Sequence, residues 1–268
     1  MLRSLWISKT GLDAQQSNLD TVSNNLANVS TTAFKRVRPV FEDLMYQNLR
    51  EPGLMSPNGD PVPVGLQAGN GSHISSTQRI HTAGAMVHSD NPLDMAISGN
   101  GFFVVDMTAA GTQASYGYTR SGNFMRDING YVVNANNQKL LKDGGGYVQI
   151  ADGATSIQVA NDGTVSYYMG NTITPINAGR IQIVNFVNPN GLASSGAGIY
   201  TQTPASGSPV SGTPGQNGLG SVTQYYTEQS NVNVAEELVA LIAAQRAYEI
   251  TAKSVSASDQ MLQKLGQL

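Results

Sequence analysis

Apolar residues recur every seven positions at both ends of this chain of 268 residues. Near the N-terminus the repeat consists of Leu5, Leu12, Leu19 and Leu26, with Val22 and Val29 filling the intermediate positions of the repeat. Near the C-terminus it consists of Val234, Leu241, Tyr248, Val255 and Leu262, accompanied by Leu238 and Ala252. Such spacing keeps one stripe of a helix facing a partner helix. We therefore predict a helix over about residues 4–29 and a second one near the C-terminus, paired in a coiled-coil-like domain that is discontinuous in sequence.

A second, polar stripe follows the first helix beside its leucines. It consists of Asn18, Thr21, Asn25 and Asn28, spaced three or four residues apart. Residues at this spacing lie on one helix face, so the amides could bond to one neighbour while the leucines pack against another. The alternative is a polar face exposed to water.

The central part of the chain has the pattern of an antiparallel β-domain. Short apolar runs such as 102–105, 131–133, 156–159 and 180–184 are separated by Asn-Gly or Asp-Gly dipeptides, which favour hairpin turns. The Gly-, Ser-, Thr- and Pro-rich tract 194–220 has few large apolar residues and is predicted to be a surface segment. The fold class is therefore α+β, with terminal helices and a central, all-β, mainly antiparallel domain.

The segment that joins the first helix to this domain is rich in proline and glycine. Helix is disfavoured over residues 30–38, because Thr31, Thr32 and Phe34 favour extended structure and Pro39 restricts Arg38. An extended loop is predicted over about residues 50–71. The predicted segments are 1–45, an extended insertion 46–72, the β-domain 73–223, and 224–268 with the second helix.

Composition argues against several functional classes. Only 12% of residues are charged and the net charge is −3, which does not suit a nucleic-acid partner. The chain has no cysteine. Its first residues lack a secretory signal pattern, and no stretch approaches the roughly 20 apolar residues of a membrane span. We expect no membrane insertion and no cleaved signal peptide.

The sequence offers no convincing catalytic or metal-binding constellation. His73, His81 and His88 stand without cysteine or a carboxylate cluster, so no metal site is predicted. The contiguous residues 88–90 do not resemble a triad, whose members converge from separate elements. The glycine-rich stretches at 99–103 and 144–146 lack the spacing of a nucleotide-binding loop. We predict no cofactor and no enzymatic activity.

Two long motifs at opposite ends are recognisable. The run Asn24-Asn25-Leu26-Ala27-Asn28-Val29-Ser30-Thr31-Thr32-Ala33-Phe34-Lys35-Arg36 resembles the N-terminal signature of the bacterial flagellar rod and hook proteins. The run Ser230 to Val239, followed by Gln245-Arg246-Ala247-Tyr248-Glu249, resembles the C-terminal signature of the same family. Residues 98–103 and 118–124 are similar to its β-domain. One departure is Ala33, where the family commonly has glycine, so a left-handed backbone is not assumed there.

The resemblance implies a structural subunit of the distal rod of the flagellar basal body. It would polymerise helically with itself, contact proximal rod proteins, hook protein and the basal-body rings, and pass through the flagellar export apparatus. The assembly interface would include Leu5, Leu12, Leu19, Val22, Asn25, Leu26, Asn28, Val29, Phe34, Lys35, Asn231, Asn233, Val234, Glu236, Leu238, Leu241, Arg246, Tyr248, Val255 and Leu262. The insertion would confer rigidity through Tyr46, Arg50, Pro52, Pro57, Pro61 and Pro63.

Three alternatives are weighed against this interpretation. Another rod or hook subunit of the same family would share both terminal motifs. A β-rich surface adhesin would account for the Asn-Gly turns but not for the terminal heptads. A cell-wall hydrolase would need an acid/base pair or a metal site that the sequence does not offer.

Overall fold

The computed structural model describes residues 2–51, 64–107, 115–170 and 174–266. The chain divides into two compact units, and each is continuous in space but not in sequence. The terminal unit consists of Met1–Ala27, Val37–Arg79 and Asn233–Leu268, and the β unit consists of Asn28–Arg36 and Ile80–Val232. The units divide the chain differently from the predicted segments, because residues 73–79 lie in the terminal unit and residues 28–36 lie in the β unit.

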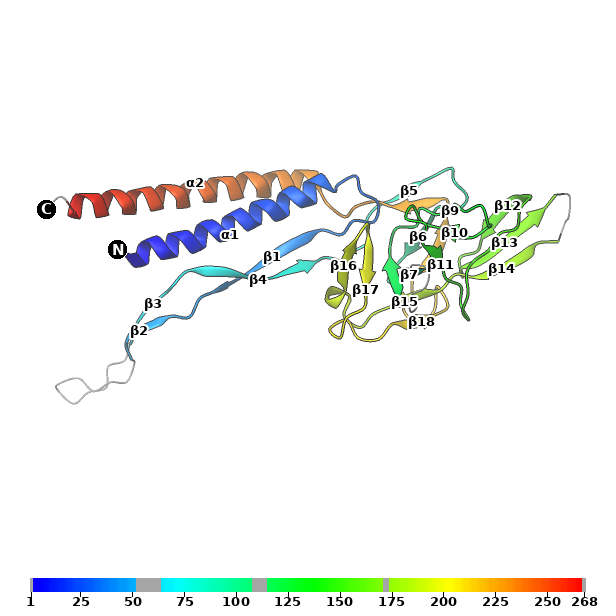
Figure 1. The fold of residues 1–268 in the computed structure, drawn as a ribbon, viewed down its shortest axis with the longest axis horizontal. Helices are drawn as coiled ribbons and strands as arrows, with labels where there is room; N and C mark the ends of the chain where they lie inside the picture. The colour runs from blue at the N-terminus through cyan, green and yellow to red at the C-terminus, as the bar shows by residue number, and fades with distance from the viewer. Residues whose placement is uncertain (1, 52–63, 108–114, 171–173, 267–268) are drawn as a thin grey trace. The chain divides into compact units, whose positions relative to one another are not determined.

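Two long helices lie side by side in the terminal unit (Figure 1). They are α1, Leu2–Ala27, and α2, Val234–Leu265. They run antiparallel, because Ser8 lies 3.4 Å from Ser254 through their hydroxyl oxygens, whereas Asn25 Nδ2 lies 3.3 Å from a carboxylate oxygen of Glu237. Both predicted helices are thus present, and α1 begins and ends two residues before its predicted limits.

The start of α2 is specified by local chemistry. The side chain of Asn233 accepts a hydrogen bond from the backbone N–H of Ala235, which would otherwise lack a partner in the first turn. Glu236 and Glu237 stand in the same turn, where negative charge interacts favourably with the helix dipole. Asn233 therefore has a structural role as the helix cap.

Two pairs of strands complete the terminal unit, and the second pair corrects part of the prediction of a long loop. Strand β1, Val37–Asp43, pairs antiparallel with β4, Ser72–Arg79, and both contact α1. Further along, β2, Gln47–Arg50, pairs with β3, Leu66–Ala68. Within the predicted loop over 50–71, Arg50 and Leu66–Ala68 therefore lie in paired strands, because each strand supplies backbone hydrogen-bond partners to the other. Residues 52–63, which include Pro52, Pro57, Pro61 and Pro63, lie outside the described residues.

The β unit is built of short, mostly antiparallel strands, in agreement with the predicted class. In the described residues, its largest sheet has the order β16-β17-β8-β7-β11-β10-β9, with β15 pairing to both β7 and β18. A second sheet has the order β12-β13-β14, and two further pairs are β6-β19 and β5-β20. The strand bounds are β5 Met86–His88, β6 Met95–Ser98, β7 Phe102–Asp106, β8 Tyr116–Thr119, β9 Met125–Arg126, β10 Val132–Val133, β11 Lys139–Leu140, β12 Ala154–Val159, β13 Thr164–Met169, β14 Ile176–Arg180, β15 Ile183–Asn185, β16 Ala193–Gly196, β17 Ile199–Thr201, β18 Val210–Gly212, β19 Ser221–Gln224 and β20 Tyr226–Glu228, with a 3-10 turn at Pro189–Gly191.

Strand β7 lies at the centre of this unit and is buried on both faces. Its alternate residues point into two different apolar clusters: Phe103 and Val105 into one, Phe102 and Val104 into the other. This alternation follows from the two-residue period of a strand. The first cluster includes Phe124, whose ring meets that of Phe103 edge-on at 5.4 Å.

Several predicted turns are present. Gly130, Gly144, Gly153 and Gly163 follow Asn or Asp and have φ between 78° and 85°, a conformation that favours glycine. The prediction that residues 194–220 form only a surface segment is wrong, because strands β17 and β18 lie within it and Tyr200 is 1% exposed. Of its few large apolar residues, Ile199, Tyr200 and Leu219 are buried, whereas Val210 is 57% exposed.

Candidate functional site

One buried carboxylate joins several parts of the β unit. Glu228, at the end of β20, accepts hydrogen bonds from Lys35 Nζ at 2.5 Å and from Arg120 Nε at 2.9 Å. The backbone N–H of Gly84 donates to the same carboxylate at 2.9 Å, and that of Ala33 donates to the carbonyl oxygen of Glu228 at 2.8 Å. We call Lys35, Arg120 and Glu228 the ion cluster. It fixes the segment 28–36 to the body of the β unit.

The cations of the ion cluster also bind backbone carbonyls. Lys35 Nζ donates to Thr82 O at 2.7 Å. Arg120 Nη1 donates to Gly99 O and Gly101 O at 2.7 and 2.8 Å. Because all three charged side chains are buried, contacts such as these are needed to offset their cost of desolvation.

Burial and charge act in opposite directions on the ion cluster. Burial raises the pKa of Glu228, but attraction to Arg120 and Lys35 outweighs burial and leaves that pKa below its ordinary value. For Lys35, burial is the largest influence and lowers the pKa, and the attraction of Glu228 offsets it only in part. Glu228 is therefore held as a carboxylate.

A buried amide performs a similar role in the terminal unit. Asn25, 1% exposed, accepts the N–H of Val37 at 3.0 Å and donates to the carbonyl of Val37 at 2.8 Å. It also donates to Glu237 at 3.3 Å, and Glu237 is equally buried. One side chain thus connects α1, the first residue of β1 and the first turns of α2.

A second asparagine binds the neighbouring residue of the same segment. The Asn231 side-chain oxygen accepts the N–H of Arg36 at 2.7 Å, and its nitrogen donates to Ile80 O at 2.9 Å and Thr82 Oγ1 at 2.9 Å. Within the β unit, Asn231 therefore ties together three stretches that are far apart in sequence.

These contacts change the interpretation of two predicted interface residues. Asn25 and Lys35 are 1% and 0% exposed, so their side chains have no surface left for a neighbouring subunit. The polar stripe on α1 is accordingly not one uniform face: Asn25 is buried within the chain, whereas Asn18, Thr21 and Asn28 are half-buried.

Most residues of the predicted heptad on α2 belong to the stripe that contacts α1. Leu241, Tyr248, Val255 and Leu262 are in both, whereas Val234 is exposed. Buried and half-buried residues follow one another at alternating spacings of four and three: Glu237, Leu241, Ala244, Tyr248, Thr251, Val255, Ser258 and Leu262. Leu5, Leu12 and Val255 line one cavity between the helices. The helices therefore pack along these stripes, and knobs-into-holes packing of the coiled-coil type stays a prediction.

The remaining predicted interface residues differ in exposure. Half-buried residues are Leu5, Leu12, Leu19, Leu26, Asn28, Val29, Phe34, Asn231, Leu241, Tyr248, Val255 and Leu262. Val22 is buried, and Asn233, Val234, Glu236, Leu238 and Arg246 are exposed. Tyr46 and Arg50 are exposed at the base of the insertion, where Arg50 Nη2 donates to Val64 O at 3.3 Å.

Apolar side chains remain uncovered on α2. Val239 and Ile250 are each 68% exposed, Met261 is 51% exposed and Ile242 is 49% exposed. With Val234 and Leu238, each 43% exposed, they form what we call the outer face of α2. Apolar side chains gathered on one helix are typical of an interaction surface.

Sequence reasoning missed Glu228, Arg120 and Glu237. Arg120 stands within the quoted motif 118–124, directly after buried Tyr118 and Thr119, and a charged residue in such a run could have signalled a buried ion pair. Glu228 follows the strand-forming residues Tyr225, Tyr226 and Thr227, and its charge there could have given the same signal. Glu237 is buried, whereas the neighbouring Leu238, a predicted interface residue, is exposed.

Neither a metal site nor a membrane span is found in the described part of the chain. No group of three or more His, Asp or Glu side chains there could hold a metal ion. Neither described helix is long and apolar enough to cross a membrane.

Comparison with known proteins identifies the family. Residues 6–35 match the flagella basal body rod protein family, residues 96–167 match the flagellar hook protein FlgE/F/G D1 domain, and residues 223–268 match the flagellar basal body rod FlgEFG protein C-terminal family. FlgG of Buchnera aphidicola subsp. Acyrthosiphon pisum is 50% identical over the full length of both chains. FlgG of Borreliella burgdorferi is 40% identical over 98% of this chain and 97% of its own, and FlgG of Bacillus subtilis is 34% identical over 99% and 98%. The chain belongs to the FlgG family of flagellar basal-body rod proteins.

Proposed function

We propose that this chain polymerises helically with itself into the distal part of the flagellar rod, a hollow, rigid shaft that transmits torque to the hook. The observation that carries this proposal is the outer face of α2. Val239, Ile242 and Ile250 are large, apolar and uncovered in a single chain, although the same helix already contacts α1. Copies of the chain can cover this face, and every subunit then gains the same apolar burial.

The proposal includes a route and a set of partners. Subunits leave the cell unfolded through the flagellar export apparatus without a cleaved signal peptide, and the rod spans the periplasm. The terminal helices order fully when they add to the growing end. The shaft meets proximal rod proteins at one end and hook protein at the other, and the basal-body rings surround it.

The insertion 46–72 supplies rigidity in this proposal. Its described base is a ribbon whose side chains are mostly exposed, including Tyr46 at 52%, Leu49 at 57% and Leu66 at 55%. We assign this ribbon and the prolines beyond it to a wedge between adjacent subunits, which resists sliding. Prolines limit the conformations available before docking and so reduce the entropy lost on assembly.

The main alternative within the family is another rod or hook subunit. A Bacillus subtilis hook-basal body complex protein, FlhP, is 28% identical over 98% of this chain. The full-length match to FlgG proteins at 50% identity favours the rod assignment.

Assembly of the purified full-length chain, followed by electron microscopy, tests the proposal. The double substitution Val239→Ser and Ile242→Ser should prevent filament formation while leaving the helix content of the dilute chain unchanged, because both residues are largely exposed there. Val187→Ser is the matched control, since Val187 is 87% exposed in the β unit. Filaments from the double variant that match those of the unchanged protein would contradict the assigned interface.

The same assay separates rigidity from assembly. A chain lacking residues 46–65 should still form filaments, but these should curve. A second variant, in which the same stretch is replaced by a Gly-Ser sequence of equal length, should also curve, because it restores length without the apolar and proline residues. Straight filaments from both variants would remove the insertion as the source of rigidity.

A further inference from the structure

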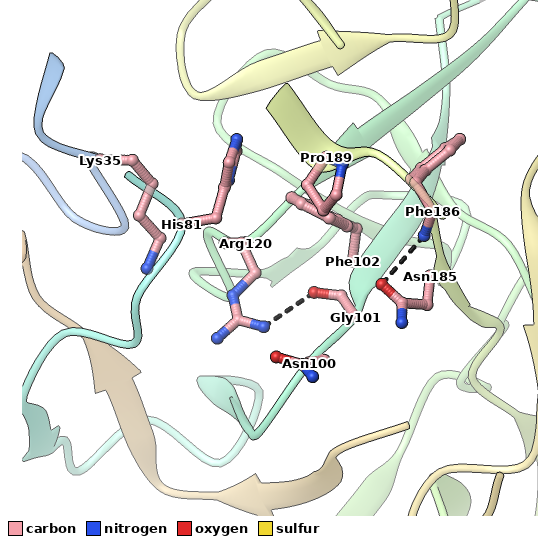
Figure 2. A pocket seen from close by; sticks show the side chains of 9 residues that line it. All are labelled: Lys35, His81, Asn100, Gly101, Phe102, Arg120, Asn185, Phe186 and Pro189. Atoms are coloured by element: carbon pink, nitrogen blue, oxygen red, sulfur yellow. Dashed lines mark hydrogen bonds between the residues drawn. The ribbon is translucent and has the colours of Figure 1, made fainter. Parts of the chain in front are cut away.

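A cavity of about 260 Å³ lies beside the ion cluster, entirely within the β unit. Its lining includes the cationic Lys35 and Arg120, the amides Asn100 and Asn185, and the rings of Phe102 and Phe186. Figure 2 shows the Arg120 guanidinium and both amide side chains gathered around the backbone of Gly101. The lining residues thus combine positive charge and amide groups with an apolar wall.

The charges beside this cavity do not balance. Lys35 and Arg120 are both buried, and together they share the single carboxylate of Glu228. No carboxylate belongs to the described residues that line the cavity. One positive charge is therefore left over among these buried side chains, where an uncompensated charge is costly.

Hydrogen-bond donors are also left over. An ammonium has three N–H donors, and the described residues accept two from Lys35, namely Thr82 O and Glu228. A guanidinium has five, and described residues accept four from Arg120, the last being a long bond of 3.4 Å from Nη2 to Ile97 O. Both side chains therefore keep donor capacity beyond the contacts that the described residues provide.

Asn185 supplies a donor on the opposite wall. Its side-chain oxygen accepts the N–H of Phe186 at 2.9 Å, which sets the orientation of the amide (Figure 2). Its Nδ2 group makes no hydrogen bond to any residue in the described ranges, so this group is available to an acceptor in the cavity.

We propose that this cavity binds a small oxoanion, of the class of inorganic phosphate. The excess charge of the ion cluster attracts it, and the Nδ2 group of Asn185 and the spare guanidinium hydrogen of Arg120 donate to its oxygens. Oxoanions suit such a site because several oxygens can accept hydrogen bonds from different directions at once. The bound anion completes the charge balance of the ion cluster and stabilises the β unit.

The test uses the full-length chain in dilute solution, so that the result does not depend on whether the chain assembles into filaments. Thermal unfolding is followed by the near-ultraviolet circular dichroism of the tyrosines while sodium phosphate replaces sodium chloride at constant ionic strength. Binding to the folded state raises Tm with increasing phosphate and gives a saturable binding curve. We expect this rise in the unchanged protein at neutral pH.

Asn185→Asp is the diagnostic variant. Its carboxylate can still accept the N–H of Phe186, so the local fold is kept, but it places a negative charge against the anion. Phosphate affinity should fall at least about tenfold. Asn177→Asp is the matched control, because the Asn177 oxygen likewise accepts a local backbone N–H, that of Gly179 at 2.7 Å, but lies outside the cavity lining. A Tm that does not respond to phosphate, or an equal response in Asn185→Asp, would overturn the proposal.

Discussion

The two units of this chain bury different kinds of side chain. In the β unit, two apolar clusters meet across β7, and large residues such as Phe103, Ile150 and Ile181 are almost completely covered. In the terminal unit, the buried residues of the two helices are small or polar: Ala14, Val22, Asn25, Glu237, Ala244 and Ser258. The larger apolar residues of the helices are half-buried or exposed wherever the structure describes their side chains. Burial of large apolar groups is the main favourable term in folding, so we expect the β unit to be the more stable by itself.

In the terminal unit, polar and apolar side chains therefore have different roles. Buried polar groups in the terminal unit specify which segments meet, since Asn25 can satisfy Val37 and Glu237 only in one register. Large apolar side chains that could stabilise this unit by burial lie instead on its surface, on the outer face of α2. Exposed apolar area of this kind suits a subunit that adds to a polymer, because its burial between subunits then stabilises the folded terminal unit.

The largest effect is expected when the ion cluster loses its carboxylate. Glu228→Ala leaves Lys35 and Arg120 buried without a counter-charge, and loss of one partner from a buried ion pair costs about 3–5 kcal/mol. Denaturant unfolding followed by tyrosine circular dichroism should show this loss, while the helix signal at 222 nm changes less. Asp90→Ala, at an exposed position of the same unit, should stay within about 0.5 kcal/mol. Equal, small losses in the two variants would mean that the apolar clusters alone hold the β unit together.

Acid should weaken the β unit through the same group. Because the pKa of Glu228 is lowered in the folded chain, the unfolded chain binds the proton more readily. The stabilisation by this carboxylate is therefore complete above the ordinary glutamate pKa of 4.5 and is lost as pH falls through the folded pKa. Glu228→Gln removes the titrating group at nearly constant volume, so its Tm should fall less steeply below about pH 4.5 than that of the unchanged protein. Parallel Tm profiles would assign the acid sensitivity to other carboxylates.

Lys35 affects the stability of the β unit at alkaline pH. Its pKa is lowered on folding, so the protonated form is disfavoured in the folded chain, and the contribution of this group to stability rises as pH approaches the ordinary lysine value of 10.5.

In the terminal unit, the expected losses are smaller. Asn25→Ala leaves the N–H and carbonyl of Val37 without their amide partner, at a cost of about 1–3 kcal/mol for unsatisfied buried groups. The helix signal at 222 nm should melt earlier, and the tyrosine signal of the β unit should change less. Gln16→Ala, at an exposed position of α1, is the control. If both variants melt alike, Asn25 does not specify the packing of this unit.

The sequence allowed the helices to be predicted because their spacing is a local pattern. It also allowed the hairpin turns to be predicted, since Asn-Gly and Asp-Gly act through their own backbone conformation. The pairing of β1 with β4 could not be predicted in the same way, because the two strands flank a long insertion and neither shows strict alternation.

The buried polar contacts were harder still to predict. Lys35 and Glu228 are separated by 193 residues, and Asn25 and Glu237 by 212. No local pattern indicates that a lysine and a glutamate so far apart will meet, and a glutamate in the first turn of a helix is by default a surface residue. The family motifs include Asn25 and Lys35 and led to a predicted interface role for both. The motifs did not indicate the residues of the same chain that bury these two side chains.

The smallest effect is expected at Ala33, which lies within the segment 28–36 that the ion cluster fixes. Its φ of 58° is left-handed although it is not glycine, and its N–H donates to Glu228 O at 2.8 Å. Glycine at this position would relieve about 1–2 kcal/mol of left-handed strain. It would also lose about 0.8 kcal/mol from a buried methyl group and about 0.5–1 kcal/mol from the greater freedom of the unfolded chain. Since these terms nearly cancel, Ala33→Gly should change the free energy of unfolding by less than about 1 kcal/mol.

Valine at the same position separates these terms. A β-branched residue is a genuine outlier at positive φ, so Ala33→Val keeps apolar character but adds strain, and it should destabilise the β unit more than Ala33→Gly does. Denaturant unfolding of both variants, followed by the tyrosine signal, gives the comparison. A larger loss for glycine than for valine would show that packing of the Ala33 side chain outweighs its backbone strain. The left-handed turn would then be held by the buried contacts of the β unit, and the residue type at this position would matter mainly for its volume.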